Sequence, residues 1–480
     1  MFHKHLFQWS IPAILETISK SIVLAASILL LEKFEFGIMT AAMLVFNYHV
    51  FISLGITDGL MIKLPGYFVK NRLEDIKKSL SISLIYIVPI IFILISIGLI
   101  AYFFYEKTLF LHVALIYGLA TIPYQYYYHY LLLNRFTYSF EITQKARFLI
   151  VATRIFIQIP LLIKYGLLGV AYGELIVYSL ASIYITFISK LRLKSYFDKE
   201  TFKKLLLFGV PILAINLVGT LAATFEKLIA SIFLDFQSIA SIGALTFIGS
   251  IFLIISSQLL SLFSQYSREF LVLKPNQKYI LFGSYISFIK TTTALYTFFL
   301  VILFQLLERY LIPTFAFQYD DIISFFPLIF VLFYLRICIS SNINFLLILG
   351  ERTKIALSHC IFILSSLVFV VFTNFTNENI FSIDNFLISI IFGGVIQMVF
   401  LLSLSAKITK SRIETVWMLS SVIIFLFLGH AFYINIFDNW IIHGMGFIIF
   451  YIAFQVLFIN TFKLLSIPKN FISLLKKENQ

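Results

Sequence analysis

The chain has 480 residues, of which 60% are hydrophobic and only 12% are charged. This composition excludes a soluble globular protein, which would need far more charge to cover its surface. The formal net charge of +13 could suggest nucleic-acid binding, but the basic residues are distributed as in a membrane protein. The two cysteines, Cys338 and Cys360, fall inside apolar segments, so neither a structural disulfide nor a cysteine metal site is expected.

Apolar runs of about 20 residues, the length that a helix needs to cross the hydrocarbon core, recur along the chain. They predict an all-α integral membrane protein with about 14 transmembrane helices. The first run is too long for the core of a signal peptide and is interpreted as a retained span. The expected spans are residues 9–31, 36–57, 80–104, 108–132, 149–163, 167–188, 205–233, 240–262, 281–307, 322–349, 355–373, 386–406, 416–437 and 441–462.

Lys and Arg residues gather in alternate connecting segments of this predicted topology. In the opposite segments the basic residues are Lys33, Lys107, Lys164 and Arg309. Because cytoplasmic loops are enriched in Lys and Arg, the asymmetry predicts that both termini are cytoplasmic. The basic charge is therefore interpreted as a topology signal rather than as a nucleic-acid-binding surface.

A weak internal repeat indicates two lobes. Trp9-Ser10-Ile11-Pro12 opens the first span, and Phe208-Gly209-Val210-Pro211 lies near the start of the seventh. Two six-helix halves that both start in the cytoplasm would be related by a pseudo-two-fold axis along the membrane normal, a transporter architecture. The predicted organisation is a six-helix lobe over residues 1–200, a second six-helix lobe over 201–412, and two C-terminal helices with a basic tail over 413–480.

Five basic residues lie inside the predicted spans, namely Lys20, Arg154, Lys227, Lys290 and Arg336. A charge at the centre of a membrane helix costs about 2.5–3.5 kcal/mol on insertion scales, so it needs water, a partner or a route to the interface. Arg154 and Lys290 lie near the cytoplasmic ends of their spans, where a side chain extended to the interface is an equally good explanation. Lys20 and Arg336 are close to mid-span, where that explanation is weakest.

Polar residues repeat at helical spacing beside these cations. Asn216 lies on the same stripe as Lys227, and Asn344 lies on the same stripe as Arg336. Polar stripes also occur where membrane helices pack closely, and that alternative stays open. For the stripes that contain a cation, we favour a water-filled internal cavity.

A cationic cavity with few acidic residues suits an anionic ligand, because Arg and Lys both bind phosphate. The acidic residues Glu16, Glu174 and Glu226 are expected to pair with the cations or to take part in ion coupling. Glu16 lies one helical turn before Lys20, so a buried ion pair between these two residues is a competing interpretation.

The sequence contains no nucleotide-binding or catalytic motif of the common kinds. A Gly-rich P-loop, a His-Glu-x-x-His helix and a Gly-x-Ser-x-Gly elbow are all missing from it. We therefore expect a protein that is not an enzyme, that binds no cofactor and that does not hydrolyse ATP.

Three segments resemble a known family of membrane proteins. They are Leu54-Gly55-Ile56-Thr57-Asp58-Gly59, Tyr165-Gly166-Leu167-Leu168-Gly169-Val170-Ala171, and Phe225-Glu226-Lys227 followed by Ile242-Gly243-Ala244-Leu245. In these segments the chain resembles the Wzx-type flippases of O-antigen and capsule repeat units. That family belongs to the superfamily that also contains the lipid II flippase and the multidrug and toxin extrusion transporters.

The resemblance, which spans nearly the whole chain, implies two six-helix lobes around a central cationic cavity lined by spans 1, 2, 7 and 8. It also implies export of an undecaprenyl-pyrophosphate-linked oligosaccharide across the bacterial inner membrane by alternating access. A polysaccharide polymerase and a chain-length regulator would be its protein partners, and nucleic acid would not be a partner. Our candidates for substrate binding are Lys20, Arg154, Lys227, Arg336, Asn216 and Asn344.

Two alternatives stay open. An ion-coupled multidrug exporter would have the same architecture, but a pump for cationic drugs would favour carboxylates over Lys and Arg inside the membrane. A polysaccharide polymerase or ligase would have similar hydropathy, but such enzymes usually carry a large external loop with functional Arg and His. The external loops predicted here are short.

Overall fold

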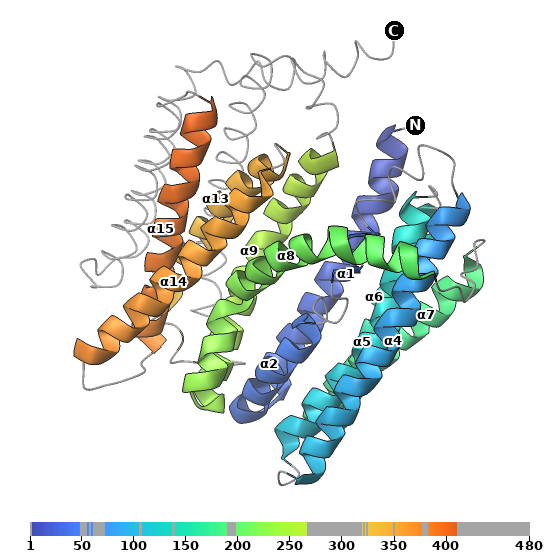
Figure 1. The fold of residues 1–480 in the computed structure, drawn as a ribbon. Coiled ribbons are helices and arrows are strands. Elements are labelled where there is room, and N and C mark those ends of the chain that lie inside the picture. Colours follow the sequence, from blue (N-terminus) through green and yellow to red (C-terminus); the bar gives the residue numbers. More distant parts are fainter. Residues whose placement is uncertain are drawn as a thin grey trace. The chain divides into compact units, whose positions relative to one another are not determined.

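The computed structural model describes residues 2–48, 55–56, 59–60, 73–104, 108–136, 140–189, 198–265, 319, 322, 325–348, 351–376 and 383–409. Within these ranges every regular element is helical, which confirms the all-α prediction (Figure 1). The chain divides into two compact units, Met1–Phe247 and Ile248–Gln480. The lobe boundary expected near residue 200 stays a prediction, and the expected C-terminal helices over 413–480 lie outside the described residues.

The first unit is built from long helices that pack lengthwise. In it α5 contacts α2, α4 and α7, while α1 contacts α6 and α7, and α2 contacts α8. Its elements are α1 (Phe2–Leu30), α2 (Lys33–Asn47), α4 (Leu73–Phe104), α5 (Leu109–Phe136), α6 (Phe140–Thr153), the π-helical turn η2 (Arg154–Gln158), α7 (Ile159–Ile188), α8 (Lys199–Phe233) and α9 (Phe236–Gln265), the last of which continues into the second unit.

The described part of the second unit contains α13 (Phe326–Ile348), α14 (Arg352–Thr376) and α15 (Ile383–Thr409). Both α13 and α14 pack against α15. A polar contact lies between α14 and α15, because the Gln397 amide nitrogen lies 3.4 Å from the Ser358 hydroxyl oxygen and 3.2 Å from His359 Nδ1.

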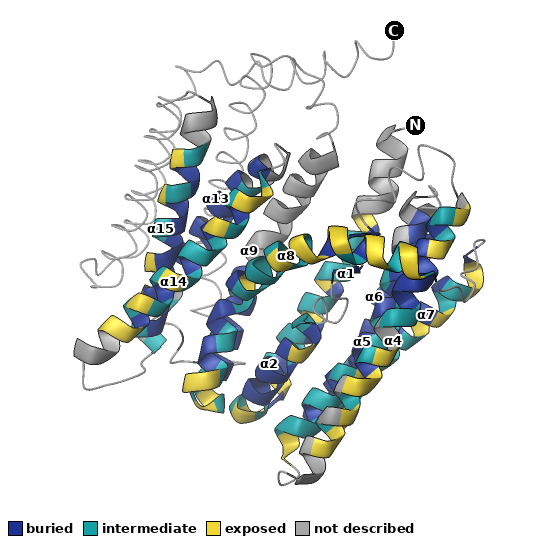
Figure 2. Cartoon of the chain, viewed as in Figure 1, coloured by how far each residue is buried: buried dark blue, intermediate teal, exposed yellow. Residues whose placement is uncertain are grey.

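Several helices expose apolar side chains that a soluble protein would bury (Figure 2). Phe156, Phe187 and Val368 are 76%, 79% and 67% exposed, as expected for side chains that face lipid. Among the described residues, six stretches are long and apolar enough to cross a membrane: Ile11–Leu30, Glu74–Ile100, Glu141–Ile188, Lys199–Phe233, Arg352–Phe372 and Asn385–Leu404. The chain is thus a multi-pass membrane protein, while the count of 14 spans stays a prediction.

The stretch Glu141–Ile188 contains a reversal and forms a helical hairpin. The chain turns at Gly166, whose φ of +57° lies in the left-handed region that favours glycine. The turn brings Arg154 and Glu174 to an N–O distance of 3.4 Å, although 20 residues separate them. In a straight helix they would be about 30 Å apart. The 48 residues therefore have the length and the geometry for two crossings, with the break where the sequence predicted it, between residues 163 and 167.

Two further glycines let the arms of this hairpin touch. A side chain at Gly169 would collide with the carbonyl oxygen of Leu161, and one at Gly173 would collide with the side chain of Gln158. The glycine pattern that carried the family resemblance in this region is therefore a requirement of close helix packing.

A similar close approach joins the end of the second predicted span to α8. A side chain at Gly209 would collide with the carbonyl oxygen of Gly55, and one at Gly59 with the carbonyl oxygen of Leu205. Gly55 also has a φ of +83°. Gly55 and Gly59 thus serve packing, because small residues allow membrane helices to approach closely.

Helix α8 begins with a capped first turn. The Asp198 carboxylate accepts hydrogen bonds from the backbone amides of Glu200 at 3.2 Å and Thr201 at 3.1 Å. The hydrogen bond from the Thr201 hydroxyl, together with these amides, lowers the pKa of Asp198.

Candidate functional site

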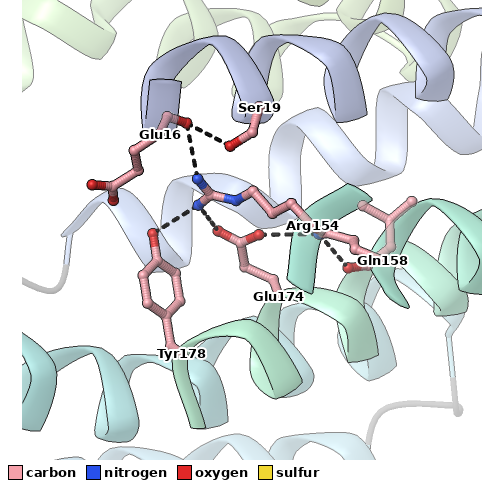
Figure 3. Close-up of polar contacts among 7 residues, drawn as sticks. Glu16, Ser19, Arg154, Gln158, Glu174 and Tyr178 are labelled. Carbon is pink, nitrogen blue, oxygen red and sulfur yellow. Dashed lines mark hydrogen bonds and ion pairs between the residues drawn. The ribbon is translucent and has the colours of Figure 1, made fainter. Parts of the chain in front are cut away.

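The strongest polar cluster in the described residues surrounds Arg154, and its side chain is 1% exposed (Figure 3). The guanidinium donates to the Tyr178 hydroxyl at 3.0 Å and to the Glu174 carboxylate at 3.4 Å. It also donates to the backbone carbonyl of Glu16 at 3.2 Å. The same Glu174 carboxylate accepts a hydrogen bond from the Gln158 amide at 3.0 Å. Arg154 is therefore bound within the helix bundle, and its extension to the interface, an alternative allowed by the sequence, is wrong.

The hairpin explains why these residues meet. Arg154 and Gln158 are the first and last residues of η2. Because they lie about one turn apart, both side chains are on the face directed toward the second arm. Glu174 and Tyr178 lie one turn apart on that arm, in α7. Short π-helical segments within α-helices frequently occur at functional sites, which agrees with the position of η2 in this cluster.

Glu16 on α1 is held at both its backbone and its side chain. Its carbonyl accepts from Arg154 and from the Ser19 hydroxyl, the latter at 2.8 Å. Its carboxylate lies 3.5 Å from Nε of Arg147 on α6. Figure 3 shows the carboxylate directed away from Arg154. The ion pair of Glu16 with Lys20, suggested by their spacing, is replaced by a tertiary pair with Arg147.

Lys20 lies one turn along α1 from Glu16. It interacts electrostatically with Glu174, Arg154 and Glu16, so it belongs to the same cluster. Within the part of the chain that the structure describes, its ammonium group takes part in no salt bridge or hydrogen bond. Together Lys20, Arg147 and Arg154 face two carboxylates, so the formal charge of the cluster is +1.

Aromatic rings line one side of this cluster. The Arg154 guanidinium lies 5.7 Å from the centroid of the Tyr178 ring, within range of a cation–π contact. Tyr178 stacks on Phe46 of α2 at 5.5 Å and contacts Tyr124 of α5 edge to face at 4.9 Å. Tyr124 in turn stacks on Tyr128 at 6.2 Å. These rings fix the Tyr178 hydroxyl that binds Arg154.

The predicted residues of α8 lie outside this cluster in the contacts that the structure describes. Asn216 is exposed, Lys227 is half-buried and Glu226 is buried at 2% exposure. The nearby Thr224 hydroxyl lies 2.8 Å from the Tyr48 hydroxyl and joins α8 to the end of α2.

The remaining two candidates belong to the second unit. Arg336 on α13 is half-buried, and its guanidinium lies 5.3 Å from the centroid of the Phe333 ring. Asn344 lies two turns farther along the same helix.

Three members of the cluster, Arg147, Gln158 and Tyr178, were not among the predicted site residues. Arg147 lies two residues before the predicted span 149–163, so hydropathy placed it in a connecting segment, although its spacing puts it on one helix face with Arg154 and Gln158. The one-turn spacing of Glu174 and Tyr178 was a second signal, because it places both polar side chains on one face of the following helix. Among the described residues, no three His, Cys, Asp or Glu side chains come together in a way that could hold a metal ion.

Solved structures with the same fold are membrane transporters. The lipid II flippase MurJ in an inward closed conformation has a TM-score of 0.62 and 16% identity, over 94% of this chain and 99% of that one. A eukaryotic MATE transporter has a TM-score of 0.64 and 15% identity, over 86% of this chain and 98% of that one. An inward-facing multidrug resistance MATE transporter of the MOP superfamily has a TM-score of 0.54 and 15% identity, over 85% and 98%.

Sequence comparison identifies the family. A search of curated proteins finds no match. The family model described as polysaccharide biosynthesis protein matches residues 28–324, which is more than half of the chain and includes the Arg154 hairpin. The resemblance inferred from the sequence is confirmed at this level, and the chain belongs to the polysaccharide biosynthesis protein family.

Proposed function

We propose that the protein is a flippase that moves an oligosaccharide linked to undecaprenyl pyrophosphate from the cytoplasmic to the outer leaflet of a bacterial inner membrane. The observation that carries this proposal is the charge balance of the Arg154 cluster. Lys20, Arg147 and Arg154 outnumber Glu16 and Glu174, and a surplus positive charge within a membrane protein favours an anionic guest. Membership of a polysaccharide biosynthesis family supports a glycan as the rest of that guest.

The proposed architecture has 14 spans, with two six-helix lobes, two C-terminal helices and both termini in the cytoplasm. Its support is the placement of Lys and Arg in alternate loops and a fold shared with MurJ over most of the chain. Transport then proceeds by alternating access, without catalysis and without ATP hydrolysis by this chain. The pyrophosphate head group enters the cationic cavity while the lipid tail stays in the bilayer.

Lys20, Lys227 and Arg336 are proposed to attract the head group electrostatically into the cavity, and Asn216 and Asn344 are its proposed polar contacts. Arg154, which has three partners, acts in this proposal by holding α1 against the hairpin. Delivery to a polysaccharide polymerase and a chain-length regulator would follow on the outer side.

The test is flipping by the purified protein in proteoliposomes that contain a lipid-linked oligosaccharide. Lys20→Gln removes a cluster charge, and Lys33→Gln removes one just beyond the end of α1, so the pair is a matched comparison. We expect Lys20→Gln to slow flipping and Lys33→Gln to leave it unchanged. Equal rates in wild type and Lys20→Gln would argue against the electrostatic basis of the proposal.

A second candidate is an ion-coupled exporter of small molecules. The buried side chain of Glu174, 8% exposed, favours it, since an acidic group inside the membrane can serve ion coupling. The fold is also that of MATE transporters. Uptake of a cationic dye by the same proteoliposomes, driven by a proton or sodium gradient, would favour this candidate over the flippase.

A further inference from the structure

Arg147 and Arg154 lie two turns apart on the first arm of the hairpin but have different surroundings. The Arg154 and Glu174 side chains are 1% and 8% exposed, so their pair is closed to a ligand. The Arg147 and Glu16 side chains are 11% and 23% exposed. The Glu16 carboxylate also points away from the Arg154 network (Figure 3). A ligand can therefore reach the Arg147–Glu16 pair more readily than the Arg154–Glu174 pair.

A buried hydroxyl beside this pair is a second polar group that a ligand there could bind. Tyr127 on α5 is 3% exposed and interacts electrostatically with Arg147 and Glu16. Among the described residues, its hydroxyl makes no hydrogen bond of good geometry, and the polar side chain that lies beside it is Arg147. Buried hydroxyl groups in proteins are nearly always hydrogen-bonded, so an acceptor bound at Arg147 would complete the hydrogen bonding of Tyr127 within the part of the chain that the structure describes.

We propose that Arg147 and the Tyr127 hydroxyl form a binding site for a phosphate group, which the Glu16 carboxylate occupies as an internal anion when the ligand is absent. The inference rests on the proposed function, because it assigns the place where the pyrophosphate of the substrate binds. Carboxylate and phosphate oxygens accept hydrogen bonds from the same guanidinium donors, so one can replace the other. Phosphate carries more charge and more acceptor oxygens than a carboxylate does, and one of the phosphate oxygens can accept a hydrogen bond from the Tyr127 hydroxyl.

The position of Lys20 explains how Glu16 can leave Arg147. Its ammonium group lies one turn from Glu16 on the same face of α1 and already interacts with it electrostatically. When phosphate takes Arg147, the Glu16 carboxylate turns to Lys20 and its charge stays compensated. Arg154 remains bound to Glu174 and Tyr178 throughout, and it keeps the α1 backbone in place.

The experiment measures binding of pyrophosphate to the full-length protein in nanodiscs by isothermal titration calorimetry. The probes are inorganic pyrophosphate, farnesyl pyrophosphate and farnesol. The variants are Glu16→Gln, Arg147→Gln and Tyr127→Phe, with Lys145→Gln as a matched control that removes an exposed cation two residues from Arg147. Thermal melting verifies that each variant is folded, and Glu16→Gln and Tyr127→Phe change the side-chain shape very little.

We expect Glu16→Gln to bind pyrophosphate about tenfold more tightly, because the internal competitor has lost its charge. Arg147→Gln should bind about tenfold more weakly, Tyr127→Phe several-fold more weakly, and Lys145→Gln as wild type. Binding of both phosphate probes would assign recognition to the phosphate alone, and binding of farnesyl pyrophosphate only would add the lipid chain as a requirement. Farnesol should bind no better to wild type than to Arg147→Gln.

Unchanged or weaker binding in Glu16→Gln would overturn the internal-anion proposal, as would equal losses in Arg147→Gln and Lys145→Gln. Either result, obtained with a wild type that binds pyrophosphate, would leave the flippase proposal standing. A wild type that binds neither phosphate probe would contradict both proposals.

Discussion

The buried ion pair between Arg154 and Glu174 gives the sharpest test of how the hairpin is held together. Replacing Glu174 with Leu leaves the Arg154 guanidinium inside the bundle with its carboxylate partner removed. Breaking a buried pair in this way costs about 3–5 kcal/mol, and the 1% and 8% exposure of the two side chains requires no reduction for solvent screening. We expect this single variant to be severely destabilised.

The double variant Arg154→Met with Glu174→Leu should regain most of that loss. Two apolar side chains of similar volume remove both the cost of desolvating the two charges and the attraction between them. Replacing a buried ion pair in this way is often close to neutral for stability. A control cycle uses the exposed pair of Lys145 and Glu141 on α6, whose atoms are closer, at 2.7 Å. Exposed pairs contribute little, so each change there should leave stability almost unaltered.

The assay is thermal unfolding in detergent, read from the retention of monodisperse protein on a size-exclusion column. The order expected from most to least stable is wild type, double variant, single variant. A double variant as unstable as Glu174→Leu alone would mean that the hydrogen bonds from Arg154 to Tyr178 and Glu16, rather than the ion pair, dominate. If Glu174→Leu lost as little stability as the Lys145 and Glu141 control variants, the reasoning about the buried ion pair would be refuted.

Three other changes test separate features. Arg336→Ala should abolish surface glycan in cells at unchanged protein level if this cation contacts the substrate, and normal glycan, measured by blotting, would exclude that role. Gly166→Ala places a side chain at a φ of +57°, so we expect a loss of stability of about 1–3 kcal/mol, seen as earlier thermal unfolding. Gly118→Ala, in the regular helix α5 with the nearest atom 3.9 Å away, should leave stability unchanged or slightly raised. Asp198 has a lowered pKa, so its cap is intact above the ordinary value of 3.8 and is lost as the pH falls through the lowered value. Amide exchange in the first turn of α8, corrected for intrinsic rates, should rise in that acid range for wild type but not for Asp198→Asn.

Sequence periodicity predicted which residues share a helix face, but it could not predict which faces meet. The cations inside the spans and the break before Gly166 followed from hydropathy and composition. The partners of Arg154 did not, because Glu174 and Tyr178 are 20 and 24 residues away and meet it only in the register set by the hairpin. That register depends on the close contacts of Gly169 and Gly173.

Arg147 was misplaced for a different physical reason. Hydropathy windows found the apolar part of the span from residue 149, whereas α6 begins at Phe140, with polar turns that such windows leave out. A pair of Glu16 with Lys20 was the competing interpretation, because the two lie one turn apart. In the structure the carboxylate of Glu16 lies beside Arg147 on a different helix. Tertiary contacts of this kind are invisible in the spacing of a single helix.

The reversal at Gly166 also bears on how the protein enters the membrane during synthesis. A lone segment carrying an arginine would partition poorly into lipid, at a cost of up to about 2.5–3.5 kcal/mol on insertion scales. Here the arm that follows brings a carboxylate to that arginine after a turn of very few residues. The two segments can leave the translocon as one unit, with their opposite charges already compensated before either is surrounded by hydrocarbon.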